Sequence, residues 1–272
     1  MKTSIESVFN KRSFEAAVEY SKNNNVQIEC GKKLATNAGI KRGDKILDMG
    51  CGTGELTSFL SEIVGRDGLV VGVDPDFGRI QYAKQRYLNM HGNLLFEHGD
   101  SSINFTQRNK SYYDVHFSNF VIQWLSPERK EEFGRVAFRS LKHGGRIAVL
   151  SHEGDQEMIK KAEEIIFKSH CSSLYQQGDP FKRARPFFIN KSETESLLIE
   201  CGFEIFSSEY HPVNYTYASI LDFINFLVAS DYKDGKKISS SGLNKFMEMF
   251  GNVDGSVGIF DPTVYQIVAH KI

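Results

Sequence analysis

Residues 46–55, with the sequence Ile-Leu-Asp-Met-Gly-Cys-Gly-Thr-Gly-Glu, constrain the fold more than any other part of the chain. An apolar run that meets three alternating glycines predicts a buried strand, a tight turn and the start of a helix. Gly50, Gly52 and Gly54 allow this turn and leave space for a ligand against bare main chain. Asp48 lies just before the turn, and a carboxylate there suits an ammonium-bearing ligand better than a diphosphate. Because the dinucleotide-binding spacing is Gly-x-Gly-x-x-Gly, a nicotinamide oxidoreductase is disfavoured.

A second acidic residue, Asp74, follows the glycine turn at the spacing that is typical of nucleoside-binding sites. The apolar run 69–73 ends at Asp74, twenty residues after Gly54, and Pro75 comes next. In nucleoside-binding α/β units, an acidic residue about 20 residues after the glycine turn accepts hydrogen bonds from ribose hydroxyls. The order of elements over residues 46–74 therefore predicts a nucleoside-binding site: a strand, a glycine loop, a helix and a second strand that ends in Asp.

Helical and strand-like patterns alternate along most of the chain. This alternation predicts an α/β fold with a doubly wound, mostly parallel, seven-stranded sheet. Ligands of such sheets bind at the carboxyl ends of the strands, where Asp48, Asp74, Asp100, Asn119 and His152 all stand. The expected strands are 45–49, 69–73, 94–98, 113–119, 146–150, 203–209 and 264–270. The expected helices are 12–38 with a break at 23–25, then 55–64, 77–90, 127–141, 155–175, 192–200 and 218–230.

Bulk properties exclude several classes of function. The 272 residues suit a single domain, and a net charge of −1 gives no field that would attract nucleic acid or an anionic membrane. No stretch approaches the roughly 20 apolar residues of a membrane span, and the first residues have no signal-peptide core, which predicts a cytoplasmic protein. The four cysteines are scattered, as expected for free thiols, and no cluster has the spacing of metal ligands. The oligomeric state stays open.

The run 46–55, followed by Asp74, resembles motif I and the second strand of the class I S-adenosylmethionine-dependent methyltransferases. The resemblance covers residues 12–152 and implies an enzyme with a Rossmann-like cofactor-binding core, S-adenosyl-L-methionine as cofactor and S-adenosyl-L-homocysteine as product. It also implies a set of cofactor contacts. These are Asp48, Gly50, Cys51, Gly52 and Gly54 in the loop, Asp74 and Pro75 for the ribose, Asp100 and Ser101 for the adenine, and Asn119 for the methionine part.

Two further segments resemble methyltransferases that act on small carboxylic acids. Residues 118–125 carry the only tryptophan of the chain, Trp124, in a loop similar to those of trans-aconitate and juvenile hormone acid methyltransferases. The pattern Tyr20-x-Lys22-x-Asn24-x-x-Gln27 is similar to the N-terminal helix of the juvenile hormone acid group. By this resemblance Gln27 and Trp124 hold the substrate carboxylate as catalytic residues. Tyr20, Gln123 and His152 are the other expected substrate contacts, under an aromatic-rich helical cap built from 153–262 and interleaved with the last strands.

The chemistry of a carboxylate agrees with such a pair. A carboxylate has a reference pKa of about 4 and is ionised at neutral pH, so it needs oriented donors and no general base. The expected function is therefore small-molecule O-methylation of an acid with an apolar tail, resembling juvenile hormone acid or farnesoic acid. One alternative is a phenol, amine or quinone-precursor methyltransferase that uses His152 as a base. A protein that binds S-adenosylmethionine without turnover is the other alternative.

Overall fold

A computed structural model describes residues 2–102, 109–154, 161, 164–166, 187–231 and 240–272, without the side chains of 2–12 and 227–231. The expected helix 155–175 lies almost wholly outside these residues. Within the described ranges, no helix is both long enough and apolar enough to span a bilayer.

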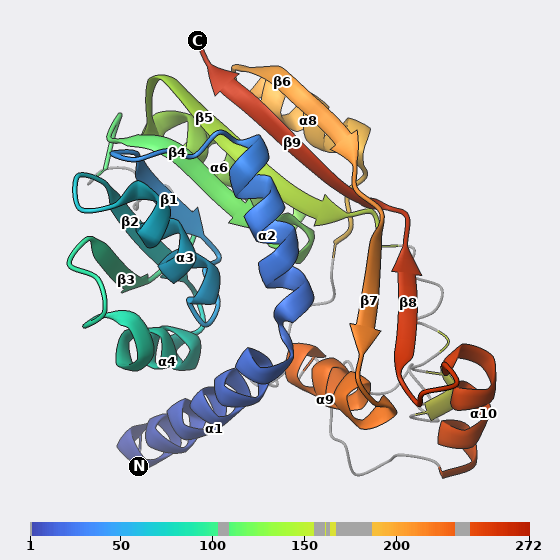
Figure 1. Ribbon diagram of the computed structural model, residues 1–272. Helices are drawn as coiled ribbons and strands as arrows, with labels where there is room; N and C mark the ends of the chain where they lie inside the picture. The colour runs from blue at the N-terminus through green and yellow to red at the C-terminus, as the bar shows by residue number, and fades with distance from the viewer. Residues whose placement is uncertain (1, 103–108, 155–160, 162–163, 167–186, 232–239) are drawn as a thin grey trace.

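A seven-stranded sheet forms the centre of the molecule, with the strand order β3-β2-β1-β4-β5-β9-β6 (Figure 1). The first five strands run parallel to one another, and β9 runs antiparallel to both β5 and β6. This sheet confirms the predicted α/β, mostly parallel, Rossmann-like fold. The strands are β1 (Lys45–Met49), β2 (Leu69–Asp74), β3 (Leu94–His98), β4 (Tyr113–Asn119), β5 (Leu141–His152), β6 (Phe203–Tyr210) and β9 (Val264–Lys271).

Helices cover both faces of the sheet, so its inner strands are apolar on both sides. Along β1, Ile46 joins the core cluster under one face while the next residue, Leu47, joins the cluster under the other, as the two-residue period of a strand requires. The first cluster includes side chains of α2 (Asn25–Asn37), α3 (Glu55–Val64) and α4 (Phe77–Tyr87), and the second includes α6 (Pro127–Ser140) and α8 (Lys191–Glu200). The first helix, α1 (Lys2–Asn23), packs against α4 and against α9 (Ile220–Asp231) (Figure 1).

A smaller aromatic unit extends from one side of the sheet. The antiparallel pair β7 (Val213–Tyr217) and β8 (Val257–Asp261) continues the β6–β9 pair, and the His211 N–H donates to the Val264 carbonyl at 2.7 Å where the two ribbons meet. Helices α9 (Ile220–Asp231) and α10 (Ser240–Phe250) pack on this ribbon (Figure 1). The rings of Phe223 and Phe246 stack at 5.3 Å within its core. This unit matches the expected aromatic-rich character of the segment after residue 152.

The structure differs from the sequence-based prediction at several element ends and in elements that were not predicted. Helix α1 begins at Lys2, ten residues before the expected start at residue 12. Strand β5 begins at Leu141 instead of residue 146, because Leu141 already pairs with Tyr113 before a bulge in the ladder. Helix α4 ends at Tyr87, three residues before the expected end at Met90. The elements β7, β8 and α10 were not predicted. A short 3-10 helix, η1 (Ile122–Trp124), follows β4 in the loop that carries Trp124.

Candidate active site

The glycine loop folds back onto the end of β2. The amides of Gly50 and Cys51 both donate to the Val73 carbonyl, at 2.7 and 3.0 Å. Gly50 has φ +85, and a Cβ there would lie 2.2 Å from Val121 Cγ2, so only glycine fits. Gly52 has φ +57, and a Cβ there would meet only the Tyr20 ring, at 3.9 Å. The main chain at Gly52 is therefore open on the side where a ligand was expected.

Two buried carboxylates support this loop. Asp74 accepts the amides of Gly52, at 3.0 Å, and of Asp76, at 2.8 Å, one on each carboxylate oxygen. Asp48 accepts the Thr57 hydroxyl at 2.8 Å. Burial raises the pKa of Asp48 to about 7, with the Thr57 hydrogen bond opposing the shift and the charge of Asp74 adding to it. Both acids stand at the ends of adjacent strands, as the sequence predicted.

The thiol of Cys51 is buried inside the loop, and burial raises its pKa. It is therefore a neutral group that fills the turn. Cys30, Cys51 and Cys201 are free thiols, and Cys171 lies outside the described residues.

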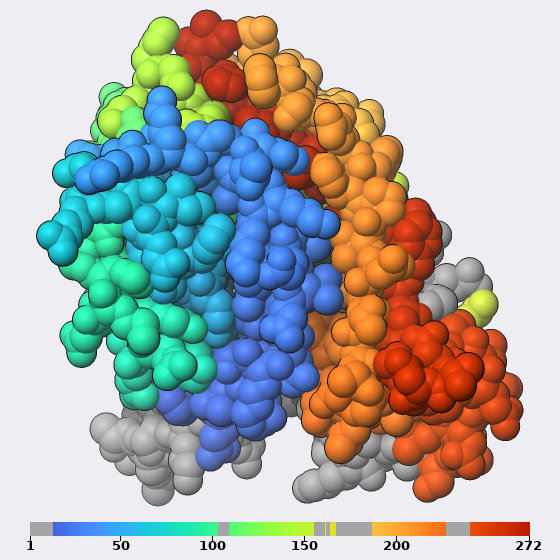
Figure 2. Space-filling view, in the orientation of Figure 1, coloured from blue at the N-terminus to red at the C-terminus, as the bar shows by residue number. Residues whose placement is uncertain are grey.

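The N-terminal helices lie over the loop. The guanidinium of Arg79 stacks on the Tyr20 ring at 4.4 Å, which holds the end of α1 against α4. At the start of α2, Asn24 donates to Thr53 Oγ1 at 3.2 Å and to Glu55 Oε2 at 3.1 Å. In Figure 2 the blue surface of residues 13–37 runs across the middle of the molecule, beside the orange surface that includes β7. Tyr20 and Asn24, which are far from residues 50–55 in sequence, are thus brought to the glycine loop.

Gln27 meets the end of β4. The side-chain amide of Asn119 donates to the Gln27 carbonyl at 2.9 Å. The oxygens Asn24 Oδ1, Gln27 Oε1 and Asn119 Oδ1 are buried and have no hydrogen-bond partner among the described residues. A buried acceptor without a partner costs about 1–3 kcal/mol, so such atoms favour a ligand that brings N–H donors. The amino-acid end of S-adenosylmethionine carries an ammonium group, and the side-chain oxygens of Asn24 and Asn119 beside the open loop fit it.

Asp100, just beyond β3, is partly exposed and forms an ion pair with Arg129 at 2.6 Å. It also accepts the amide of Ser102 at 3.0 Å. Partial burial raises the pKa of Asp100, but the hydrogen bond and charge of Arg129, together with the hydrogen bonds from Ser102, outweigh that effect and lower it. Ser101 is buried, and the Pro75 carbonyl lies 2.9 Å from His98 Nε2. The adenine contacts expected of Asp100 and Ser101 stay predictions.

Trp124 is half-buried at the end of η1, where its amide donates to the Val121 carbonyl at 2.8 Å. Gln123 beside it is buried, and its Oε1 accepts the Ser151 hydroxyl at 2.9 Å. The Gln123 side chain therefore joins η1 to the end of β5. The substrate contact expected of Gln123 stays a prediction.

His152, at the end of β5, lies between two aromatic rings and an acid. Its ring centroid is 5.9 Å from Phe120 and 5.1 Å from Phe188, and its Nδ1 is 3.9 Å from Asp261 Oδ2. Burial lowers the pKa of His152, and the charge of Asp261 opposes the shift. Asp261 was missed from sequence because it ends β8, an unpredicted strand. The Asp-x-Thr turn was an available signal, since Asp261 Oδ1 accepts the amide and hydroxyl of Thr263 at 2.8 and 2.7 Å.

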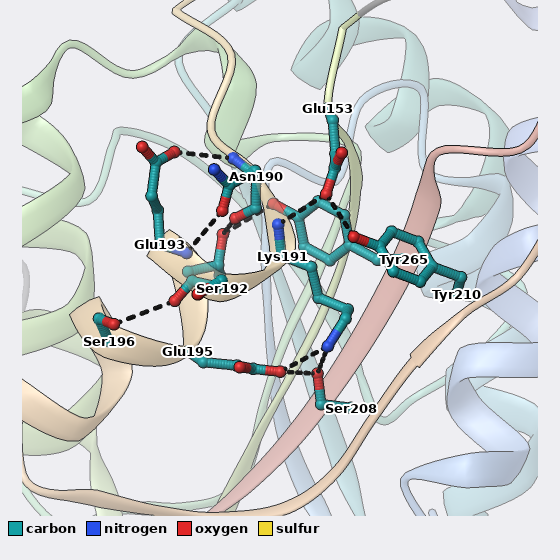
Figure 3. A network of polar contacts seen from close by, with 11 residues as sticks. Glu153, Asn190, Lys191, Ser192, Glu193, Glu195, Ser196, Ser208, Tyr210 and Tyr265 are labelled. Carbon is teal, nitrogen blue, oxygen red and sulfur yellow. Dashed lines mark hydrogen bonds and ion pairs between the residues drawn. The ribbon is translucent and has the colours of Figure 1, made fainter.

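The residue after His152 fixes this strand end to neighbouring elements. Figure 3 shows Glu153 pointing to Lys191 and Tyr210. One Glu153 oxygen accepts the Lys191 amide at 3.0 Å and the Tyr210 hydroxyl at 2.8 Å. Lys191 begins α8 and Tyr210 ends β6, so Glu153 joins the end of β5, which carries His152, to α8 and β6.

Known proteins similar in sequence to this chain include several methyltransferases. The family model described as "Methyltransferase domain" matches residues 46–145. The C-methyltransferase UbiE of ubiquinone and menaquinone biosynthesis from Pseudomonas syringae pv. tomato is 32% identical over 182 residues, which are 61% of this chain and 68% of that protein. The malonyl-[acyl-carrier protein] O-methyltransferase of Paenibacillus sp. is 24% identical over 277 residues, covering 96% of each chain. A protein of Invertebrate iridescent virus 6 is 24% identical, and the match spans 63% of its length and 70% of this chain.

Solved structures share the fold. A SAM-dependent methyltransferase from Aquifex aeolicus aligns with a TM-score of 0.56 at 14% identity, covering 94% of this chain and 98% of that one. A geranyl diphosphate C-methyltransferase from Streptomyces coelicolor, in complex with S-adenosyl-L-homocysteine, aligns at 0.53 and 12% identity, covering 90% of this chain and 80% of that one. Sequence relatives and fold together lead to one conclusion. The chain belongs to the class I S-adenosylmethionine-dependent methyltransferases.

Proposed function

We propose that this enzyme methylates the carboxylate of a small acid with an apolar tail. The observation that carries the proposal is the hydrogen bond from the Asn119 side chain to the main-chain carbonyl of Gln27. This bond brings Gln27 of α2 to the end of β4, where the loop that carries Trp124 begins. The Paenibacillus relative supports it, because that protein is an O-methyltransferase of malonyl-[acyl-carrier protein] and aligns along 96% of this chain.

In the proposed mechanism the residues bind and orient an acid that is already ionised. When bound, S-adenosylmethionine supplies an electrophilic methyl group on a sulfonium. The Gln27 amide and the Trp124 indole N–H donate to one carboxylate oxygen and leave the other free to attack. Transfer of this methyl group to the free oxygen would form one O–C bond for the S–C bond broken and would cancel the opposite charges. Phe120 and Phe188 give the site apolar walls, and positioning of the reacting atoms at about 3 Å supplies most of the rate gain.

A base-assisted reaction on a phenol or quinone precursor is the second candidate, because of the pair formed by His152 and Asp261. A histidine whose pKa is lowered is neutral at pH 7 and can accept a proton. Asp261, 3.9 Å from Nδ1, would stabilise the imidazolium that results. The UbiE relatives, which act in ubiquinone and menaquinone biosynthesis, lend this candidate support.

One experiment separates the two candidates. The enzyme is incubated with methyl-labelled cofactor and a panel of carboxylic acids, phenols and quinone precursors, at several pH values, as wild type and as His152→Ala. Carboxylate methylation predicts label in ester products, a rate that is flat from about pH 6 to 9, and little loss in His152→Ala. Label only in phenols or quinone precursors, with a rate that falls on the acid side as His152 becomes protonated and that is lost in His152→Ala, would overturn the proposal.

A further inference from the structure

Lys130 is a buried cation that joins two loops beside the candidate acceptor site. It is 5% exposed, and its ammonium donates to the Leu125 carbonyl at 2.7 Å and to the Phe187 carbonyl at 2.5 Å. The first carbonyl follows Trp124 directly, and the second precedes Phe188, which packs against His152. A backbone bond from the Phe187 amide to the Gln123 carbonyl, at 2.7 Å, runs beside this bridge.

The position of Lys130 is unfavourable for its charge, and its hydrogen bonds to carbonyl oxygens offset part of that free-energy cost. Lys130 belongs to the first turn of α6, and its amide donates to Ser126 O at 2.9 Å. A cation there faces the positive end of the helix dipole, and a buried ammonium loses its hydration. The two carbonyls replace that hydration. They belong to segments more than sixty residues apart in sequence, so the bridge fixes the position of one loop relative to the other.

We infer that Lys130 is a positioning residue that holds the Trp124 loop and the Phe187–Phe188 segment together as the wall of the acceptor site. This inference rests on the proposed function only for the kind of acceptor. Its structural part concerns where Trp124 is held, and that can be measured without any substrate. Since Trp124 is the only tryptophan in a chain with eleven tyrosines, emission from selectively excited tryptophan reports on this loop alone.

Lys271 offers a matched control. Its ammonium also donates to two carbonyls, of Phe138 at 2.6 Å and Leu141 at 2.7 Å, and lies 4.6 Å from the Phe138 ring. It lies in β9 at the opposite end of the strands, where β5 begins. Lys130→Met and Lys271→Met thus remove the same kind of bridge, one beside the acceptor site and one far from it.

The test compares tryptophan emission, acrylamide quenching and calorimetric binding of S-adenosyl-L-homocysteine in wild type and both variants. We expect Lys130→Met to shift the emission to the red and increase quenching with cofactor affinity unchanged, whereas Lys271→Met matches wild type. Lys130→Arg, which keeps the charge and several N–H donors, is expected to restore most of the protection. If Lys130→Met does not fold, Lys130→Gln, which keeps two donors on a shorter side chain, is measured instead and is expected to increase quenching less.

Equal quenching in wild type and in the folded Lys130 variant would overturn the inference, as would an equal increase in Lys271→Met. With the best acid from the acceptor panel, the value of kcat/KM should fall about tenfold or more in Lys130→Met only, mainly through KM. If no acid is methylated, the proposed function fails while the fluorescence result still decides the role of Lys130.

Discussion

His116 gives the sharpest prediction about stability. It lies in the middle of β4, fully buried, with its ring edge-on to Phe133 at 5.2 Å, and neither ring nitrogen has a hydrogen-bond partner among the described residues. Burial lowers its pKa from 6.5 to about 3. Because the folded pKa is below the unfolded one, the unfolded chain binds more protons between these values, and stability falls as the pH drops below about 6.5.

The size of the effect follows from the shift. At about pH 5 the imidazole is 1.5 units below its unfolded pKa, and at about 1.4 kcal/mol per unit it lowers the free energy of unfolding by roughly 2 kcal/mol relative to neutral pH. The substitution His116→Leu removes the titrating group and its unpaired nitrogens while keeping an apolar side chain of similar size. The gap in stability between variant and wild type should therefore widen by roughly 2 kcal/mol between about pH 7.5 and about pH 5.

Urea unfolding followed by circular dichroism measures this gap. The pairwise difference cancels the contributions of Asp48 and His152, which are present in both proteins. His143, an exposed histidine at the start of β5, supplies the control His143→Leu, which should follow wild type because the side chain stays in water in both states. Parallel stability curves for wild type and His116→Leu would refute the reasoning.

Three predictions concern the active site. Asp74→Ala should weaken S-adenosyl-L-homocysteine binding about ten- to a thousandfold, because the expected acceptor of the ribose hydroxyls, which also accepts the Gly52 amide, is lost. An unchanged dissociation constant in calorimetry would remove Asp74 from the proposed cofactor site. Gly52→Val should abolish binding, because valine resists φ +57 and its side chain fills the open space, so normal binding by the folded variant would place the cofactor elsewhere. Gln27→Ala and Trp124→Phe should each lower kcat/KM about ten- to 150-fold with little change in cofactor affinity, and full turnover in either variant would argue against a carboxylate held by that side chain.

The parts of the fold that could be predicted from sequence share one property. Strands β1 and β2 are apolar on both faces and end at glycine or aspartate, so their pattern depends little on what packs against them. The glycine loop and Asp74 could be located for the same reason. In contrast, β7 alternates buried Tyr215 and Tyr217 with exposed polar residues, and only a partner strand forty residues away makes that pattern a strand.

Helix α10 and the positions of Lys130 and Asp261 could not be predicted because they depend on tertiary contacts. Helix α10 begins with Ser240-Ser241-Gly242, which is typical of a loop, yet a Cβ on Gly242 would lie 2.1 Å from the Ile165 carbonyl. The glycine is there for close packing and does not end the helix. Likewise, no local pattern indicates that Lys130 is buried or that Asp261 faces His152, because each depends on segments distant in sequence.

The position of β9 between β5 and β6 has a consequence for how the chain is made. Strand β6 leaves the ribosome before β9, its neighbour in the sheet, and until β9 follows both β5 and β6 present an unpaired edge. The aromatic ribbon shares this delay, since β8 is the partner of β7 among the described strands and is synthesised just before β9. A pause in synthesis after β7 has emerged and before β8 and β9 emerge would therefore expose three strands with unpaired edges, which makes the nascent chain prone to aggregation.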